Sequence, residues 1–371
     1  MADELVAAAK EGRADRLAAL LRDGADVDAK DDTYKTALMW AAEEGHDSCV
    51  AALLHGGADE DLCQYVLMGE EEYRGDDDEP PEEGSTALMF AAENGHAGCI
   101  AVLLCGGAAV NATDYTDKTA LMFAAENGHV GCIAALLNGG AAVDAWEQGT
   151  GDHFTALTFA AENGHEWCVV ALLVGGAATD HDQAGDTALV FAARDGHTEC
   201  VEALLTHGAN VGSKALVYAA RYGHVGCVKA LLNGGADVDA KNDAGETALM
   251  FAARAGHGEC IVELLRKGAD VDAKNDAGKT ALEIALQNGH GECVLLLREG
   301  SAVSQRNEII KCGICYLAYG NARPPMCPSC RHVYCRDCWD RVLAGTHARA
   351  PGKCPRCRAD VCRADVRPLH M

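Results

Sequence analysis

Aromatic residues, proline and basic residues are scarce in this chain of 371 residues. Phe, Trp and Tyr make up 5%, there are eight prolines, and 31 Lys and Arg stand against 56 Asp and Glu. Apolar runs are short and interrupted by Gly, and acids follow Met1 where a secretory signal needs a basic start and an apolar stretch. We therefore expect no membrane span and no secretion. A hydrophobic content of 49% excludes disorder overall and leaves room for two or more domains.

Cysteine, in contrast, is abundant, with 19 residues. Without a secretion signal, this number favours a reducing compartment in which thiols serve packing or metal binding. We expect a cytoplasmic protein.

The charge divides the chain into two parts. Residues 301–371 hold 12 Lys and Arg against 5 Asp and Glu, net +7, whereas residues 1–300 hold 19 against 51, net −32. An acidic surface of that size repels nucleic acid phosphates and favours basic protein partners, so we expect no nucleic acid binding. Residues 70–83 alone carry nine acids and one Arg, which predicts a solvated acidic loop.

The first 300 residues are an internal repeat marked by the tripeptide Thr-Ala-Leu. Successive copies are 50, 33, 36, 32, 27, 33 and 33 residues apart. Nine residues after each start stands a Gly, ten after it a His, and thirteen after it a Cys. The starts are Thr36, Thr86, Thr119, Thr155, Thr187, Lys214 (a Lys-Ala-Leu variant), Thr247 and Thr280.

The 33-residue period resembles that of ankyrin repeats, in which a hairpin-like finger and two antiparallel helices bury their apolar faces against neighbouring units. The resemblance implies a mainly α solenoid over residues 1–300, with a capping unit at 1–30, eight repeats and an acidic insertion at 69–84. The Gly would end the first helix of each unit, and the adjacent His would tie that turn by hydrogen bonds. The Thr-Ala-Leu-Met style is also similar to that of ankyrin proteins of diplomonads.

Two departures from the ankyrin pattern have structural consequences. Thr-Ala-Leu-Met stands where ankyrin proteins read Thr-Pro-Leu-His, so stability should shift toward apolar packing. The short interval between Thr187 and Lys214 leaves only 210–213 where a finger belongs, which predicts a gap in the row of fingers.

The periodic His and Cys residues raise the question of metal binding. The Cys lies three residues after the His in every repeat, at a position where ankyrin proteins carry a small buried apolar residue. We interpret these cysteines as packing residues. No catalytic constellation is found in the array.

Several predicted fingers carry aromatic residues, which are otherwise rare in this chain. Such side chains concentrate binding energy at protein interfaces, so we predict a site for a protein partner in units two to five. Incidental loop aromatics are the alternative. The candidate residues are Tyr34, Tyr115, Trp146, His153 and Phe154.

Residues 312–358 contain four short pairs of metal-ligating side chains. The order is Cys312-x2-Cys315, fourteen residues, Cys330-x-His332-x2-Cys335-x2-Cys338, fifteen residues, and Cys354-x2-Cys357. Each short pair can supply two corners of a zinc tetrahedron, and two pairs complete a site. Cys327-x2-Cys330 is a competing pair.

This order and spacing resemble those of RING fingers. The resemblance implies a small cross-braced domain with two zinc ions, one held by Cys312, Cys315, Cys335 and Cys338 and the other by Cys330, His332, Cys354 and Cys357. Metal binding should supply most of its folding free energy, because a segment this small lacks an adequate apolar core.

A RING finger implies docking of a ubiquitin-conjugating enzyme and positioning of its ubiquitin thioester. The positions that match the family's docking surface are Ile314, Leu317, Val342 and Pro355, and Arg358 matches the cation that bridges conjugating enzyme and ubiquitin. We expect a short linker at 301–311 and a tail at 359–371. Either the linker or the RING finger should cover the apolar helix of the last repeat, which would fix the RING finger in place. The overall hypothesis is a ubiquitin ligase with a substrate-binding array; the alternative is a non-catalytic scaffold with a structural zinc finger.

Overall fold

The computed structural model describes residues 1–64, 84–147, 154–180 and 187–309, and the side chains as far as Gly300. Within these ranges the chain forms helices and one two-stranded sheet. The helices are α1 (Ala2–Lys10), α2 (Ala14–Arg22), α3 (Ala37–Glu43), α4 (Asp47–His55), α5 (Ala87–Glu93), α6 (Ala97–Gly106), α7 (Ala120–Glu126), α8 (Val130–Asn138), α9 (Ala156–Glu162), α10 (Glu166–Val174), α11 (Ala188–Asp195), α12 (Thr198–Thr206), α13 (Ser213–Tyr222), α14 (Val225–Asn233), α15 (Ala248–Ala255), α16 (Gly258–Arg266), α17 (Ala281–Gln287) and α18 (Gly291–Ile309). The strands are β1 (Cys63–Gln64) and β2 (Ser85–Thr86).

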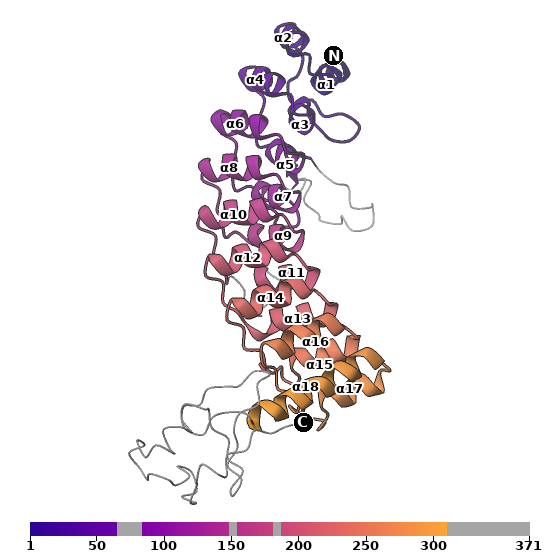
Figure 1. Cartoon of the computed structure of the whole chain (residues 1–371). Coiled ribbons are helices and arrows are strands. Elements are labelled where there is room, and N and C mark those ends of the chain that lie inside the picture. The colour runs from indigo at the N-terminus through magenta and orange to yellow at the C-terminus, as the bar shows by residue number, and fades with distance from the viewer. Residues whose placement is uncertain (65–83, 148–153, 181–186, 310–371) are drawn as a thin grey trace, which may run out of the picture.

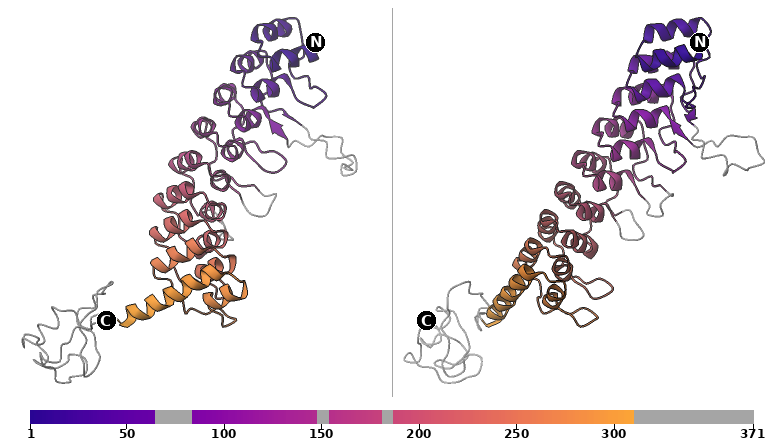
Figure 2. Two further views of the ribbon diagram at one scale, coloured as in Figure 1. Left: turned by 45° about the vertical axis from the view of Figure 1, so that its right-hand side comes forward. Right: turned by 90° about the vertical axis from the view of Figure 1, so that its right-hand side faces the viewer.

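The helices form consecutive pairs that stack into one elongated, curved body, as Figures 1 and 2 show. The odd-numbered helices, called inner helices below, contact the inner helices of neighbouring units, and the even-numbered outer helices do the same. Loops between units project beside the inner helices and are called fingers below. Unit 1 is the pair α1 and α2, the predicted cap, and unit 9 is the pair α17 and α18. The predicted repeat solenoid is confirmed.

The repeat motif builds each inner helix. The hydroxyls of Thr36, Thr86 and Thr119 accept a hydrogen bond from the backbone N–H three residues later, at 3.3–3.4 Å, and so cap the helix that follows. The Ala and Leu of the motif are buried between units. The methionines that replace the family's His are buried as well, which agrees with the expected shift toward apolar packing: Met39, Met89, Met122 and Met250.

The Gly-His pair joins neighbouring units. His197 Nε2–H donates to the Glu162 carbonyl of the preceding unit at 2.9 Å, and a Cβ on Gly164 (φ +74°) would lie only 2.4 Å from the His197 ring. The glycine is therefore required both for its backbone conformation and for the close approach of the imidazole. The same bond, at 2.9–3.1 Å, is made by His46, His96, His129, His165, His224, His257 and His290. The backbone N–H of the His also ties the turn of its own unit, as predicted: His197 N–H donates to the Ala192 carbonyl at 2.9 Å. The imidazole bond to the preceding unit was not predicted.

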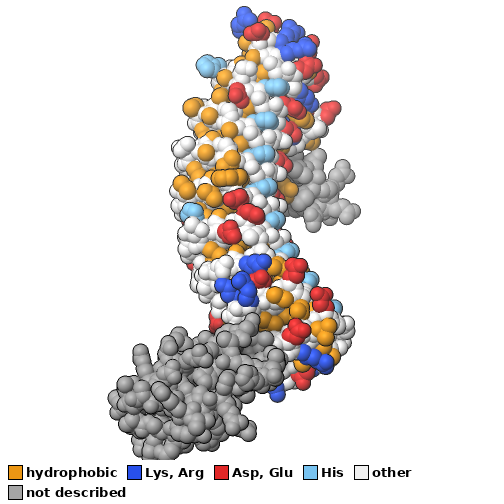
Figure 3. Space-filling model, viewed as in Figure 1, with side chains coloured by type: hydrophobic (Ala, Val, Ile, Leu, Met, Phe, Trp, Pro, Cys, Tyr) orange, Lys and Arg blue, Asp and Glu red, His pale blue; other side chains and the backbone are white. Residues whose placement is uncertain are grey.

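This arrangement places the histidines in a line along the stack, which Figure 3 shows as a row of pale blue side chains. Each imidazole spans the boundary between two units and so supplies a hydrogen bond between them.

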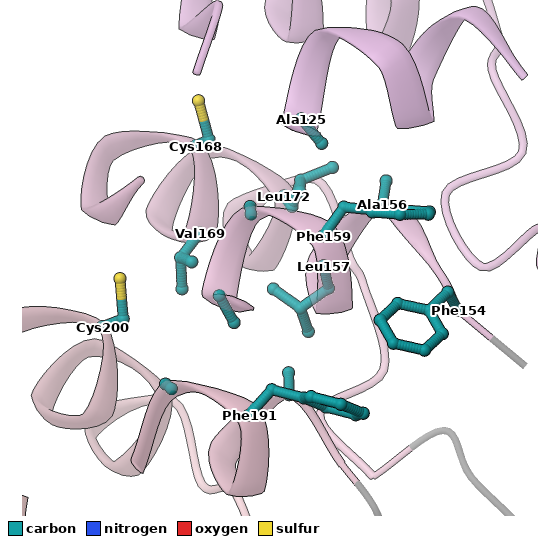
Figure 4. Close-up of a cluster of buried hydrophobic side chains, with 14 of the residues drawn as sticks. Ala125, Phe154, Ala156, Leu157, Phe159, Cys168, Val169, Leu172, Phe191 and Cys200 are labelled. Atoms are coloured by element: carbon teal, nitrogen blue, oxygen red, sulfur yellow. The ribbon is translucent and has the colours of Figure 1, made fainter. Parts of the chain in front are cut away.

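The repeat cysteines pack in the core, as their register predicted. All eight are 0–1% exposed, and Figure 4 shows Cys168 and Cys200 on the outer helices of two adjacent units. Burial raises the pKa of Cys132 and Cys168 to about 11. Among the cysteines that the structure describes, none forms a disulfide and Cys105 is exposed.

The predicted gap in the finger row is present. Only residues 207–212 connect α12 to α13, and α13 begins at Ser213, two residues before the Ala of its repeat. A cavity of about 350 Å³ opens at this place, lined in part by Asp180, Asn210 and Lys214. The fingers on either side of unit 7 are therefore separated.

The last outer helix, α18, is longer than the others. The outer helices of units 2 to 8 end at a glycine with positive φ, such as Gly57 and Gly268, whereas Ser301 takes this place in unit 9. Without that glycine the helix continues to Ile309, through most of the predicted linker 301–311. Leu295 of α18 is 62% exposed. The linker and finger side chains that we expect to cover this helix lie outside the described residues, so the cover stays a prediction.

Strands β1 and β2 form the base of the finger that carries the acidic insertion. They pair antiparallel, with Cys63 opposite Thr86, and Lys30 Nζ of the preceding finger donates to the Cys63 carbonyl at 3.2 Å. Residues 69–83 of the predicted insertion lie outside the described residues.

Candidate protein-interaction site

Three of the predicted partner-binding aromatics lie exposed on the fingers. Tyr34 is 42% exposed, Tyr115 is 52% exposed and Trp146 is 37% exposed. Tyr34 has a φ of +61°, a conformation that a bulky residue rarely adopts. His153 lies outside the described residues.

Phe154 is placed differently from our prediction of a finger-tip anchor. It is 9% exposed, and its ring centroid lies 5.2 Å from that of Phe159 and 4.8 Å from that of Phe191. Figure 4 shows it at the edge of this aromatic cluster, on the side away from the cysteines. Phe154 directly precedes Thr155, which caps α9, so it lies at the base of the finger. There it packs against Phe159 and Phe191 of two inner helices.

The fingers of units 2 and 4 share one turn geometry. Asp31 Oδ1 accepts hydrogen bonds from the backbone N–H groups of Thr33 and Lys35, and Asp114 Oδ1 accepts them from Thr116 and Lys118. Burial raises the pKa of Asp31, but the hydrogen bonds from Thr33, Trp40 and Lys35 outweigh it and lower the pKa to about 2.

A second recurring position, seven residues after each repeat start, changes charge along the stack. It carries Glu in units 2 to 5 and Arg in units 6 to 8. The residues are Glu43, Glu93, Glu126 and Glu162, then Arg194, Arg221 and Arg254. This position was not among the predicted functional residues, although the alignment on Thr-Ala-Leu contains it.

Most of these side chains form ion pairs, and the cation of each pair lies over an aromatic ring of an inner helix. Lys118 Nζ lies 3.0 Å from Glu126 and 4.4 Å from the centroid of Phe159. Arg194 pairs with Glu162 of the preceding unit at 2.8 Å. Within the described residues, no ion pair or side-chain hydrogen bond ends on the exposed carboxylate of Glu93.

A pocket of about 660 Å³ opens between the fingers and inner helices of units 3 to 5. Its apolar walls come from aromatic rings and its polar walls from four acids and one lysine, so the lining carries a net negative charge. The lining residues are Ser85, Glu93, Asp114, Tyr115, Thr116, Lys118, Phe123, Glu147, Phe154, Phe159 and Glu162. The pocket thus brings together two of the predicted residues, Tyr115 and Phe154, with acids that the sequence analysis did not select.

Comparison with known proteins agrees with this architecture. The family described as ankyrin repeats (three copies) matches residues 5–62, 56–147, 142–215, 157–242 and 216–307. The chain is an ankyrin-repeat protein. The crystal structure of the human ASB11 ankyrin repeat domain is 33% identical, with a TM-score of 0.52 over 57% of this chain and 96% of that one. A search of curated proteins found no match.

Ankyrin repeats serve protein–protein binding, and the pocket lies where this ankyrin array exposes its finger aromatics. The helices that the structure describes include none long and apolar enough to cross a membrane. Over the same residues, no three His, Cys, Asp or Glu side chains gather closely enough to hold a metal ion.

The predicted zinc ligands, the docking residues and Arg358 all lie outside the described residues of this ankyrin-repeat protein, and so does the tail 359–371. The matched family ends at residue 307, before the first of the paired cysteines. Their chemistry therefore rests on the sequence.

Proposed function

We propose that this ankyrin-repeat protein is the substrate receptor of a ubiquitin ligase. Its array binds a protein substrate on the finger side of units 2 to 5, through Tyr34, Tyr115, Trp146 and His153 with Phe154 as support. Residues 312–358 form a RING finger that recruits a ubiquitin-conjugating enzyme. The substrate is then held beside the activated ubiquitin, which is catalysis by positioning.

The observation that carries the proposal is the spacing of seven of the eight thiols and one of the two imidazoles from Cys312 to Cys357. Soft ligands in four short pairs fit two tetrahedral zinc ions, and eight ligands fill both tetrahedra. Zinc would hold the fold of this segment. With no coordination position left for water, the residues of the segment act through protein contacts.

Those contacts would come from the residues that resemble the RING docking surface. Ile314, Leu317, Val342 and Pro355 supply apolar area for the conjugating enzyme. Arg358 supplies a planar guanidinium that can donate to two carbonyl oxygens at once, which suits a bridge between conjugating enzyme and ubiquitin.

Helix α18 supports a fixed connection between the two activities. It continues to Ile309, so only two residues separate its end from Cys312. A flexible linker of a dozen residues would let the RING finger move over tens of ångströms relative to the array. A helical connection instead restricts the directions in which ubiquitin can be delivered.

An autoubiquitination assay of the full chain with a panel of conjugating enzymes tests the proposal. Ile314→Ala and Arg358→Ala should each reduce ubiquitin transfer at least about tenfold, about 1.4 kcal/mol of lost positioning. Arg363→Ala, which removes a guanidinium beyond the last ligand, should leave it unchanged. Zinc content, measured for each variant, verifies that the finger is intact.

The second candidate is a non-catalytic scaffold with a structural zinc finger. It is favoured by the matched family, which covers the array and serves protein binding. A zinc-loaded chain that transfers no ubiquitin with any conjugating enzyme would contradict the ligase and support the scaffold.

A further inference from the structure

The pocket of units 3 to 5 has an occupied counterpart in the first finger of the same chain. There, Lys10 of the capping unit reaches the finger of unit 2. Its Nζ lies 3.5 Å from Asp31 Oδ2 and 3.6 Å from the centroid of the Trp40 ring. Trp40 Nε1–H also donates to Asp31 Oδ2 at 2.8 Å. The second oxygen of Asp31 is thus satisfied by an ammonium and an indole.

The counterpart can be aligned residue by residue. A Cβ on Gly12 would meet the ring of His46, and a Cβ on Gly95 would meet that of His129, so the two glycines are equivalent. Lys10 and Glu93 each stand two residues before that glycine. Lys10 and Glu93 are therefore equivalent positions of two different units.

In unit 4 the residues equivalent to Lys10 and Trp40 provide no cation and no N–H donor for Asp114, the equivalent of Asp31. Asp114 holds the same turn as Asp31 with its Oδ1 and is 4% exposed. Phe123 replaces Trp40 and has no N–H to donate, while Glu93 replaces Lys10 and adds a second negative charge. None of the hydrogen bonds between described residues ends on Asp114 Oδ2.

The other cation of this finger does not fill the gap. Lys118 is bound to Glu126 and lies over Phe159, in the way that Lys35 is bound to Glu43 and lies over Phe90. Two ammonium groups, those of Lys10 and Lys35, thus lie over aromatic rings at the first finger, whereas at the finger of unit 4 only that of Lys118 does, beside a pocket of about 660 Å³. The acids around the pocket do not form a group that could hold a metal ion, which favours an organic cation.

We propose that this pocket binds a lysine side chain of a protein partner, with its ammonium between Asp114, Glu93 and the ring of Phe123, in the position that Lys10 takes in the first finger. An ammonium desolvated against an aromatic face and two carboxylates gains both cation–π and ionic attraction. The inference rests on the array being a protein-binding surface, and it is independent of ubiquitin transfer.

Selection of short displayed peptides on the full, zinc-loaded chain tests the proposal. Lysine should be enriched at one position, and replacement of that lysine by norleucine in the synthetic peptide should weaken binding at least about tenfold. Asp114→Asn and Glu93→Gln should each weaken binding by a similar factor. Glu44→Gln, which removes an exposed carboxylate outside the pocket, should leave it unchanged.

A substitution within the chain separates recognition from loss of folding. Glu93→Lys would place an ammonium where Lys10 stands in the first finger, so it should abolish binding of the lysine peptide while the melting temperature stays equal or rises. A merely structural role for Glu93 would lower the melting temperature instead.

Three results would overturn the proposal. One is equal binding of the lysine and norleucine peptides, and another is unchanged binding to the Glu93→Lys variant. The third is binding that appears only after removal of residues 301–371, which would make the chain's own basic segment the occupant. Because none of these measurements involves ubiquitin, failure of the ligase assay would leave them unaffected.

Discussion

The chain uses cysteine in two different ways in its two regions. In the array, one cysteine recurs in each of units 2 to 9 at a fixed register and is buried. In residues 312–357, cysteines are clustered in short pairs, and in one pair a histidine takes the place of the second cysteine. The difference teaches that a periodic cysteine reports packing, because every unit presents the same environment. Clustered pairs instead predict a metal site, because a metal needs several ligands at one point.

Metal removal should separate the two regions most strongly. A chelator should unfold the segment 312–357, because each zinc site is expected to supply about 10 to 16 kcal/mol. Alkylation followed by peptide mass mapping should then label its thiols, while Cys49, Cys168 and Cys260 stay protected. Equal labelling of the paired thiols before and after chelation would refute the zinc sites.

Damage to the array should follow from its backbone geometry. Gly164→Ala combines a strained φ with a Cβ 2.4 Å from the His197 ring, and it should cost about 2 to 5 kcal/mol. The matched control is Gly176→Ala, which has positive φ but no atom within 4 Å and should cost about 1 to 2 kcal/mol. Urea unfolding measures both; equal losses would contradict the role of the imidazole contact.

Within the array, a buried and an exposed cysteine should also differ. Cys168→Ser places a hydroxyl in an apolar site and should lower the free energy of unfolding by about 1 to 3 kcal/mol. The exposed Cys105, when changed to Ser, should shift it by no more than about 0.5 kcal/mol. Thermal or urea denaturation of the two variants provides the measurement, and comparable losses would argue against packing as the role of Cys168.

A further difference from an exposed thiol is expected in the pH dependence of stability. Burial raises the pKa of Cys132, Cys168 and Cys260 to about 11, against 9.0 for an exposed thiol. The unfolded chain therefore loses these protons first, so stability is full below pH 9 and declines as pH rises toward about 11. Urea midpoints across this range should fall in the wild type and fall less in Cys132→Ala. A midpoint that stays constant from pH 9 to 11 would contradict the burial effect.

Much of the array could be predicted from the sequence because its determinants lie within one period. The Thr-Ala-Leu motifs predicted where the inner helices begin. The short interval before Lys214 predicted the missing finger, and the His-Cys register predicted the buried cysteines of the core. Two local signals were present but not used: Ser301 in place of a terminal glycine, which extends α18, and the change from Glu to Arg seven residues after each start.

The candidate site was predicted only in part. Tyr34, Tyr115 and Trp146 are exposed, as finger residues before a helix cap should be. Phe154 is buried, because the residue just before the cap turns back onto the aromatic rings of two inner helices. Its neighbour Phe191 is 37 positions later in the chain, so no local pattern could indicate this contact.

The sequence by itself determined the stack, its register and the residues in its core. Each unit repeats the same motif and buries its apolar side chains against neighbouring units. Only the tertiary structure decided which residues of different units meet. It placed each histidine on the preceding unit, Lys10 on the next finger, and Glu93 beside Asp114 in a pocket. The physical reason is that charge balance and close approach depend on distances between units, which a one-dimensional period does not contain.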